Sequence, residues 1–257
     1  MSTPSGTLYL VPNTLDFGTG SAATDIAEAL PMGSLRVAAR LEHWLAENAR
    51  STRAFLKRVD RACPLARPVQ EVRIVELPRP AKGRHEAGEP GRIDALLAAA
   101  CSGADIGLLS EAGLPAVADP GALVVEAAHR LGIAVCALPG ASAITLAVAA
   151  SGLNGQSFAF VGYVPVSAEA RATRLRSLEV ASRRDAQTQV LIETPYRNAA
   201  LLDALLVCLQ PGTTLAVSVG LTLGQGYTRS ARVAAWRQRP TVLPADVPAV
   251  FAFLATS

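Results

Sequence analysis

The chain has few of the residues that build metal sites, disulfide frameworks and aromatic stacking surfaces. Its 257 residues include four cysteines and three histidines, and only 5% are aromatic. The cysteines are Cys63, Cys101, Cys136 and Cys208. They form no C-x-x-C pair and have no set of histidines nearby, so the pattern predicts neither a zinc site nor disulfide bonds. We therefore expect free thiols, no bound metal and a reducing, cytoplasmic location.

A strong net charge and a targeting segment are also missing. The formal net charge of +3 is too small to indicate nucleic-acid binding by itself. The N-terminus lacks a basic region and its apolar run is only Leu8–Val11, so we expect no signal peptide. The uncharged stretch 133–168 is interrupted by Pro139 and Gly140. It therefore predicts a buried strand over Ile133–Leu138, a turn and a buried helix over Ala141–Ala150 in place of a membrane span.

The first half of the chain contains a regular alternation of strand-like and helix-like segments. The predicted strands are Thr7–Val11, His43–Glu47, Arg73–Leu77, Ile106–Leu109 and Ile133–Leu138. The predicted helices are Ala22–Leu30, Ala49–Val59, Ile93–Ala100 and Ala122–Leu131. Such alternation predicts parallel strands that are joined by helical crossovers.

The pattern changes after Gly155. The predicted strands are now Phe158–Tyr163, Thr188–Glu193, Leu215–Val219, Tyr227–Val233 and Val250–Leu254, and the predicted helices are Glu169–Leu178 and Asn198–Leu209. No strong helical pattern separates the last three strands, which is typical of a sheet with an antiparallel portion. We therefore predict an α/β fold of two domains: residues 1–140 with a mainly parallel sheet, and residues 141–257 with a mixed sheet.

Glutamates follow or end three of the predicted strands. Glu111 lies in the loop S-E-A-G-L-P-A-V-A-D-P-G (Ser110–Gly121), which also carries Asp119. Glu47 and Glu193 end two other strands. Because open α/β sheets bind ligands at the carboxyl ends of their strands, we expect the three glutamates to line one edge of a sheet as a site. The alternative is that each merely stabilises the start of the following helix.

A glycine-rich segment, L-D-F-G-T-G-S-A over Leu15–Ala22, resembles the glycine motif of Rossmann-type enzymes. A Rossmann-type nucleotide-dependent enzyme using Gly18 and Gly20 is therefore one alternative. In that motif the strand runs directly into the glycines, whereas here three residues, Pro12 to Thr14, intervene. A plain turn explains the segment better.

Five motifs occur in an order that resembles a known family. They are Ser110–Gly121, L-P-G-A-S-A (Leu138–Ala143), A-S-G-L (Ala150–Leu153), F-x-F-x-G-Y-x-P (Phe158–Pro165) and E-T-P-Y-R (Glu193–Arg197). From about Gly6 to Leu254 the chain resembles the tetrapyrrole (corrin/porphyrin) methylase superfamily of S-adenosylmethionine-dependent methyltransferases. Within that superfamily it is most similar to the branch of bacterial 16S rRNA cytidine 2′-O-methyltransferases.

This resemblance implies a two-domain α/β enzyme, usually a homodimer, that binds S-adenosyl-L-methionine in a cleft between its domains. The methyl acceptor is rRNA, at the ribose 2′-oxygen of cytidine, or a small molecule. The motif positions that match the family's cofactor contacts are Pro12, Ala112, Gly113, Leu114, Val117, Ser142, Ala143, Glu193 and Leu221. Small residues flank the fixed turns among them, so backbone groups are free to reach a ligand.

The substrate side of the family pattern is altered. V-P-N-T-L-D (Val11–Asp16) replaces T-P-I-G-N-L, and Glu47–Arg50 reads E-N-A-R in place of E-D-T-R. These departures keep a second alternative open, a non-catalytic cofactor-binding or regulatory protein. If the chain is catalytic, Glu47 or Glu111 is our candidate general base, with Arg50 and Arg53 orienting an anionic substrate. Tyr196 and Arg197 are further candidate substrate contacts.

Two basic segments leave RNA binding open. The first comprises Arg50, Arg53, Lys57, Arg58 and Arg61, most of which fall on one side of a predicted helix. The second comprises Arg171, Arg174, Arg176, Arg183 and Arg184. A solvated helix face has the same pattern, and no aromatic residues are interleaved with these arginines for base stacking.

Overall fold

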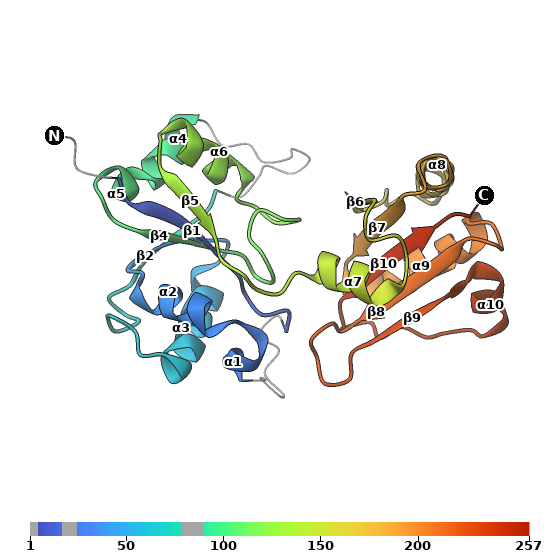
Figure 1. The fold of residues 1–257 in the computed structure, drawn as a ribbon, viewed down its shortest axis with the longest axis horizontal. Coiled ribbons are helices and arrows are strands. Elements are labelled where there is room, and N and C mark those ends of the chain that lie inside the picture. Colours follow the sequence, from blue (N-terminus) through green and yellow to red (C-terminus); the bar gives the residue numbers. More distant parts are fainter. Residues whose placement is uncertain (1–4, 17–24, 79–89, 257) are drawn as a thin grey trace. The chain divides into compact units, whose positions relative to one another are not determined.

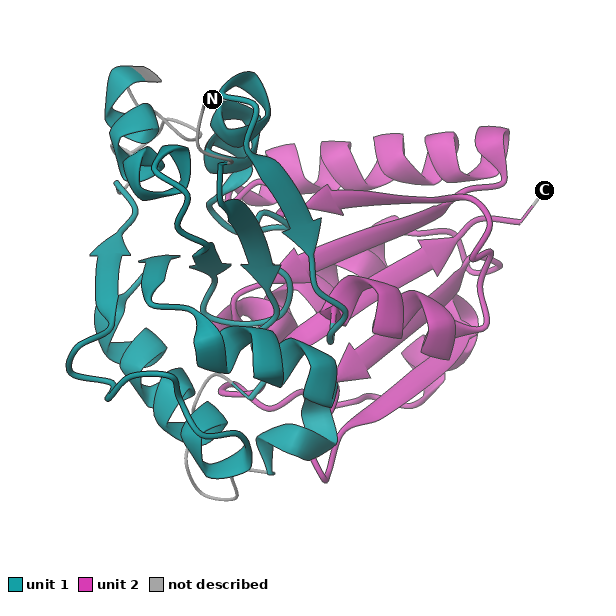
Figure 2. Cartoon of the chain, turned by 60° about the vertical axis from the view of Figure 1, so that its left-hand side comes forward, with its two compact units in different colours: residues 1–141 teal, residues 142–257 magenta. Residues whose placement is uncertain are grey.

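The computed structural model describes residues 5–16, 25–78 and 90–256 (Figure 1). The chain divides into two compact units, Met1–Ala141 and Ser142–Ser257 (Figure 2). Each unit contains one five-stranded sheet: a wholly parallel sheet in the first and a mixed sheet in the second. The predicted fold class is confirmed. Gly18 and Gly20 lie outside the described residues.

The sheet of the first unit has the strand order β3-β2-β4-β1-β5. Its strands are β1 (Thr7–Val11), β2 (His43–Ala46), β3 (Arg73–Glu76), β4 (Ile106–Leu109) and β5 (Ala134–Ala137). The central strands are apolar on both sides because helices cover both faces of the sheet. Since all five strands are parallel, the loops that follow them leave from the same edge of the sheet.

Two groups of helices cover the two faces of this sheet. They are α1 (Ile26–Ala29), α2 (Met32–Arg40) and α3 (Ala49–Ala62) on one face, and α4 (Pro90–Leu96), α5 (Ala98–Cys101) and α6 (Ala122–Arg130) on the other (Figure 1). Trp44 packs with Leu35 and Phe55 under the first group. Leu8 packs with Leu97 and Val124 under the second.

The sheet of the second unit has the order β6-β7-β10-β8-β9, in which only the β6–β7 pair is parallel. Its strands are β6 (Phe158–Gly162), β7 (Thr188–Glu193), β8 (Thr214–Val219), β9 (Tyr227–Arg232) and β10 (Ala249–Leu254). Its helical elements are α7 (Ala143–Ser151), α8 (Ala168–Asp185), η1 (Pro195–Arg197), α9 (Asn198–Cys208) and α10 (Val233–Gln238). The apolar cluster under α7 is separate from the cluster that α8, α9 and α10 share.

Several elements differ from the sequence prediction, and the single predicted helix Ile93–Ala100 is divided into α4 and α5. The helix α2 was not predicted, because Gly33 and Ser34 weaken its propensity; packing of Leu35 and Ala38 decides it. The helix α8 continues to Asp185, beyond the predicted end at residue 178. The short helix α10 separates two strands that were predicted without a helix between them. Burial of Leu35 and Ala38 favours α2, and burial of Val233 and Trp236 favours α10. The added turns of α8 instead bury the polar residues Glu179 and Ser182.

Candidate functional site

Glu47 and Glu111 meet at the edge of the first unit's sheet. Their strands, β2 and β4, are hydrogen-bonded neighbours that end in register at Ala46 and Leu109. The backbone N–H of Glu111 donates to Glu47 Oε2 at 3.1 Å. Ser51, in the first turn of α3, donates its hydroxyl to Glu111 Oε1 at 2.5 Å. Each carboxylate keeps its other oxygen without a hydrogen bond from the described residues.

The third glutamate of the predicted edge, Glu193, lies elsewhere. It ends β7, which belongs to the sheet of the second unit. The expectation that all three glutamates line one sheet edge was therefore wrong. Spacing along a sequence shows that strands end in charge, but it does not show which strands pair with each other.

Asn13 connects the loop after β1 to the loop after β4. The sequence prediction did not include Asn13 among the site residues. Its carboxamide donates to the backbone oxygens of Ser110 at 2.9 Å and Glu111 at 3.0 Å. Its backbone N–H donates to the oxygen of Gly113 at 2.8 Å. A buried asparagine with these partners fixes the distance between the loops. Its place directly after a strand, within V-P-N-T-L-D, was the available signal.

The loop Ser110–Gly121 has an unusual backbone. Gly113 and Gly121 have φ values of +69° and +133°, and Ala116 and Ala118 have φ values of 64° and 66°. Left-handed conformations in residues other than glycine persist only where the surroundings impose them, and such strain gathers at functional sites. Ala112, Gly113, Leu114 and Val117, four of the predicted cofactor contacts, lie on this loop. The loop therefore has the set shape that its glycines and prolines predicted.

Two observations along this edge concern how a ligand would be held. Ser110 Oγ is buried and has no hydrogen-bond partner among the described residues. A buried hydroxyl without a hydrogen-bond partner is unfavourable unless a ligand or a water molecule forms a hydrogen bond with it. At the loop after β5, the backbone of Gly140 lies so close to Pro12 that an added Cβ would fall 2.3 Å from the proline ring. Pro12, a predicted cofactor contact, is thus held against the loop that precedes Ser142.

The first two turns of α3 carry the two arginines predicted for the substrate. Asn48 caps this helix by accepting from the backbone N–H of Arg50 at 2.8 Å and of Ser51 at 3.3 Å. The capping bonds set the helix to begin directly after Glu47. Arg50 and Arg53 are exposed and form no ion pair with any described residue. Both cations are free to meet an anionic ligand.

Asp119 joins the two glutamates at this edge. Burial, together with the charges of Glu47 and Glu111, raises the pKa of Asp119 to about 7. Burial also raises the pKa of Glu47, against the hydrogen bond from the Glu111 N–H, and the charge of Glu111 adds to the rise. The negative charges at this edge therefore favour a protonated Asp119. No described group of His, Cys, Asp and Glu has the arrangement of a metal site.

Asp119→Asn should stabilise the protein above neutral pH. Because the folded pKa of Asp119 is raised from 3.8 to about 7, the folded state holds this proton more tightly than the unfolded chain. The stability contributed by Asp119 therefore falls as the pH rises through that window. We expect the variant to exceed the native protein by about 1–2 kcal/mol at pH 8, after discounting for partial solvent screening. Thermal and urea unfolding should show the difference vanish near pH 4; a constant difference at all pH values would contradict it.

The second unit brings together its own set of predicted residues. Arg197 Nη2 lies 3.0 Å from Glu193 Oε2, which fixes the turn that follows β7. Tyr196, between them in sequence, is 73% exposed. Ala143 and Leu221 pack with the apolar cluster under α7. Because β7 and β8 both run antiparallel to β10, Glu193 and Leu221 follow strand ends at the same edge of this sheet.

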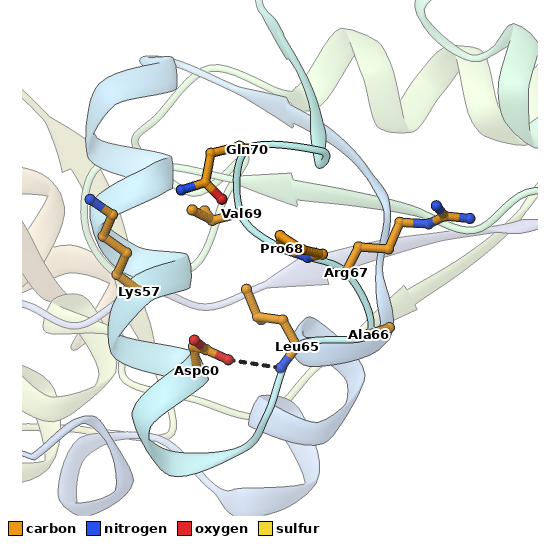
Figure 3. Close-up of a pocket in the computed structure, with 8 residues that line it drawn as sticks. All are labelled: Lys57, Asp60, Leu65, Ala66, Arg67, Pro68, Val69 and Gln70. Atoms are coloured by element: carbon orange, nitrogen blue, oxygen red, sulfur yellow. Dashed lines mark hydrogen bonds between the residues drawn. The ribbon is translucent and has the colours of Figure 1, made fainter.

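One surface pocket lies apart from the predicted residues. Its volume is about 530 Å³, and it lies between α3 and the loop that leads to β3 (Figure 3). It is lined by Lys57, Asp60, Leu65, Ala66, Arg67, Pro68, Val69 and Gln70. Figure 3 shows Asp60 facing this loop, where it accepts a hydrogen bond from the Leu65 N–H at 3.0 Å.

Comparison with known proteins identifies the family of the chain. Residues 28–230 match the family model described as Tetrapyrrole (Corrin/Porphyrin) Methylases. The chain belongs to this family. The resemblance drawn from the five motifs is confirmed, and with it S-adenosyl-L-methionine as the cofactor. The match does not support the alternative of a Rossmann-type enzyme using Gly18 and Gly20, which precede the matched residues.

Curated relatives of this tetrapyrrole methylase carry the name "Ribosomal RNA small subunit methyltransferase I". The protein of Mesorhizobium japonicum is 38% identical over 138 residues, which cover 54% of this chain and 45% of the relative. The protein of Halalkalibacterium halodurans is 32% identical over 206 residues, which cover 79% of this chain and 61% of the relative. The chain spans about half the length of the curated relatives it matches.

Solved structures agree with the fold of a tetrapyrrole methylase. A uroporphyrin-III-C-methyltransferase from Thermus thermophilus superposes with a TM-score of 0.54 at 21% identity, over 97% of this chain and 94% of that one. A structure of such an enzyme from the same organism, complexed with S-adenosyl homocysteine, gives a TM-score of 0.52 at 19% identity, over 97% of both chains. None of the described helices combines the length and the apolar character that crossing a membrane requires.

Proposed function

We propose that this protein is an S-adenosylmethionine-dependent methyltransferase that acts on small-subunit ribosomal RNA, at the ribose 2′-oxygen of a cytidine. The observation that carries the proposal is the meeting of Glu47 and Glu111 beside a strained loop on the edge of a parallel sheet. The relatives named as rRNA methyltransferases support the RNA acceptor. A small-molecule acceptor is the second candidate, because the altered V-P-N-T-L-D and E-N-A-R segments are those of the substrate side.

The residues along both sheet edges suit S-adenosylmethionine. The unpartnered Ser110 hydroxyl and the backbone of the loop around Gly113 offer hydrogen bonds to a polar cofactor. We propose that the cofactor is held by the residues predicted from the motifs: Pro12, Ala112, Gly113, Leu114, Val117, Ser142, Ala143, Glu193 and Leu221. The cofactor supplies an electrophilic methyl group on a sulfonium. The protein has to hold the acceptor in line with that group, which is worth roughly 7–11 kcal/mol of the barrier.

A hydroxyl acceptor also has to lose a proton. The free oxygen of Glu47 or of Glu111 is placed at the edge to take it, while Arg50 and Arg53 hold an anionic substrate. The Ser51 hydroxyl and the Glu111 N–H fix one oxygen of each carboxylate, so each base points in a defined direction. Burial raises the pKa of Glu47, which makes its carboxylate a stronger base than a solvated one. Tyr196 and Arg197 are proposed to contact the acceptor from the second unit.

A methyl-transfer assay tests the proposal. Purified protein and radiolabelled S-adenosylmethionine are incubated with one acceptor at a time. The acceptors are unmodified small ribosomal subunits, naked small-subunit rRNA and a tetrapyrrole extract. We expect label in the rRNA, and nucleoside digestion with mass spectrometry should identify 2′-O-methylcytidine. Label in another nucleoside would contradict the cytidine assignment, and label in the extract alone would favour the small molecule. Cofactor binding in calorimetry without transfer to any acceptor would favour a non-catalytic protein.

The homodimer stays a prediction. Light scattering of the purified protein would measure the mass of the particle in solution and test it.

A further inference from the structure

One face of α3 is basic from end to end. The helix buries Thr52, Phe55, Leu56 and Val59 against the first unit's core. Its exposed cations are Arg50, Arg53, Lys57 and Arg61, which we name the α3 stripe. Their spacings of three, four and four residues place them along one side of a helix. Arg58, the remaining cation of this segment, is turned away from the stripe to pair with Asp16 at 2.8 Å.

The α3 stripe is a row of four cations on one helix, whereas the other unpaired arginines that the structure describes in this unit, Arg36, Arg73 and Arg92, lie on three separate elements. Four arginines there, Arg40, Arg58, Arg67 and Arg130, are paired with acidic side chains. None of the four stripe cations forms an ion pair with a residue that the structure describes. Asp60, the acidic residue on the exposed side, already accepts the Leu65 N–H. Neighbouring like charges on a helix repel each other, so an uncompensated row of cations favours binding of a polyanion.

The stripe leads away from the carboxylate edge. Ser51, beside Arg50, is the residue that donates to Glu111, so the first turn of α3 lies at the proposed site. Arg50 and Arg61 are eleven residues apart, a rise of about 16 Å along a helix. That distance is far longer than a small anion and spans about five nucleotides of a stacked strand, at roughly 3.4 Å each. Lys57 also borders the pocket beside the helix, so the surface there is hollowed (Figure 3).

We propose that the α3 stripe holds the sugar-phosphate backbone of a single-stranded RNA segment whose target nucleotide lies at the edge formed by Glu47 and Glu111. This inference rests on the proposed function and adds the path of the substrate to it. The arginines near the edge position the target nucleotide, and Lys57 and Arg61 hold the strand further along. Contacts of this kind give affinity and register without base specificity. Selection of the cytidine is thus left to the edge itself.

The test removes two cations from the far end of the stripe and compares them with a matched pair elsewhere. The variant is Lys57→Gln with Arg61→Gln, and the control is Arg36→Gln with Arg92→Gln, two exposed arginines on α2 and α4. The probe is a fluorescent single-stranded cytidine 12-mer RNA, titrated between 50 and 300 mM salt. We expect the stripe variant to bind roughly tenfold more weakly at low salt. The slope of log affinity against log salt should fall by about 1.4, which is 0.7 for each lost phosphate contact.

The possible results distinguish a failure of the α3 stripe proposal from a failure of the proposed function. Unchanged calorimetric affinity for S-adenosylmethionine would show that the variant remains folded. The proposal for the α3 stripe would be overturned if the stripe variant kept the salt slope of the native protein. It would also be overturned if the control variant lost as much RNA affinity as the stripe variant. Both conclusions hold even if the native protein methylates rRNA. If the native protein binds no RNA and transfers no methyl group to it, the proposed function fails first. Charge reversal, Lys57→Glu with Arg61→Glu, should weaken binding further than the glutamine pair; an equal effect would count against an electrostatic contact.

Discussion

Replacing the general base with its amide is expected to lower methyl transfer by roughly 10²–10⁴-fold, the usual contribution of a positioned base. The two variants are Glu47→Gln and Glu111→Gln, and one of them should show the full loss. Glutamine keeps an acceptor oxygen for the Ser51 hydroxyl or for the Glu111 N–H, so the local hydrogen bonds are retained. The proton acceptor alone is removed, and single-turnover rates with saturating cofactor measure its loss.

Three further measurements make this prediction specific. Affinity for S-adenosylmethionine should stay within about twofold in both variants, because neither carboxylate is a proposed cofactor contact. Glu126→Gln, at an exposed position on α6, is the matched control and should leave the rate unchanged. Glu47→Gln should also lower the pKa of Asp119, since the charge of Glu47 helps to raise it. Native turnover in both variants would exclude the two glutamates as the base.

Gly140→Ala should lower both stability and cofactor affinity. Its new Cβ would lie 2.3 Å from the Cβ and the Cγ of Pro12, so one of the two loops has to move. Forcing an atom into such a contact typically destabilises a protein by about 1–3 kcal/mol. The displaced loops include Pro12, a proposed cofactor contact, and the segment that precedes Ser142. We therefore expect calorimetric affinity for S-adenosylmethionine to fall by at least about tenfold.

A second glycine provides the control for this substitution. Gly33 lies in α2, and an added Cβ there would meet no atom within 4 Å. Gly33→Ala should leave cofactor affinity unchanged and raise stability by up to about 1 kcal/mol, because alanine loses less conformational entropy in a helix. Native cofactor affinity in Gly140→Ala would show that the two loops do not form part of the cofactor site.

Much of the fold could be predicted because its strands and helices have strong local patterns. The run Ile106–Leu109 is apolar at every position because both faces of its strand are buried, and β4 has these bounds. The helix α2 could not be found in this way, because Gly33 and Ser34 interrupt the helical pattern of its first turn and the helix is anchored by Leu35, which packs into the core. β5 was expected to be buried, yet it is an edge strand with exposed positions, since strand order is not written in any local pattern.

The sequence by itself determined the family, the α/β class and the edge-forming loop, because ordered motifs and hydrophobic periodicity are local properties of the chain. The tertiary structure decided which of those residues meet. Pairing of β2 with β4 joins Glu47 to Glu111, whereas Glu193 belongs to another sheet. It also decided that Asn13 bridges two loops, and that burial together with the charges of Glu47 and Glu111 raises the pKa of Asp119 to about 7. Contacts between residues about a hundred positions apart, and the burial that follows from them, arise only when the chain has folded.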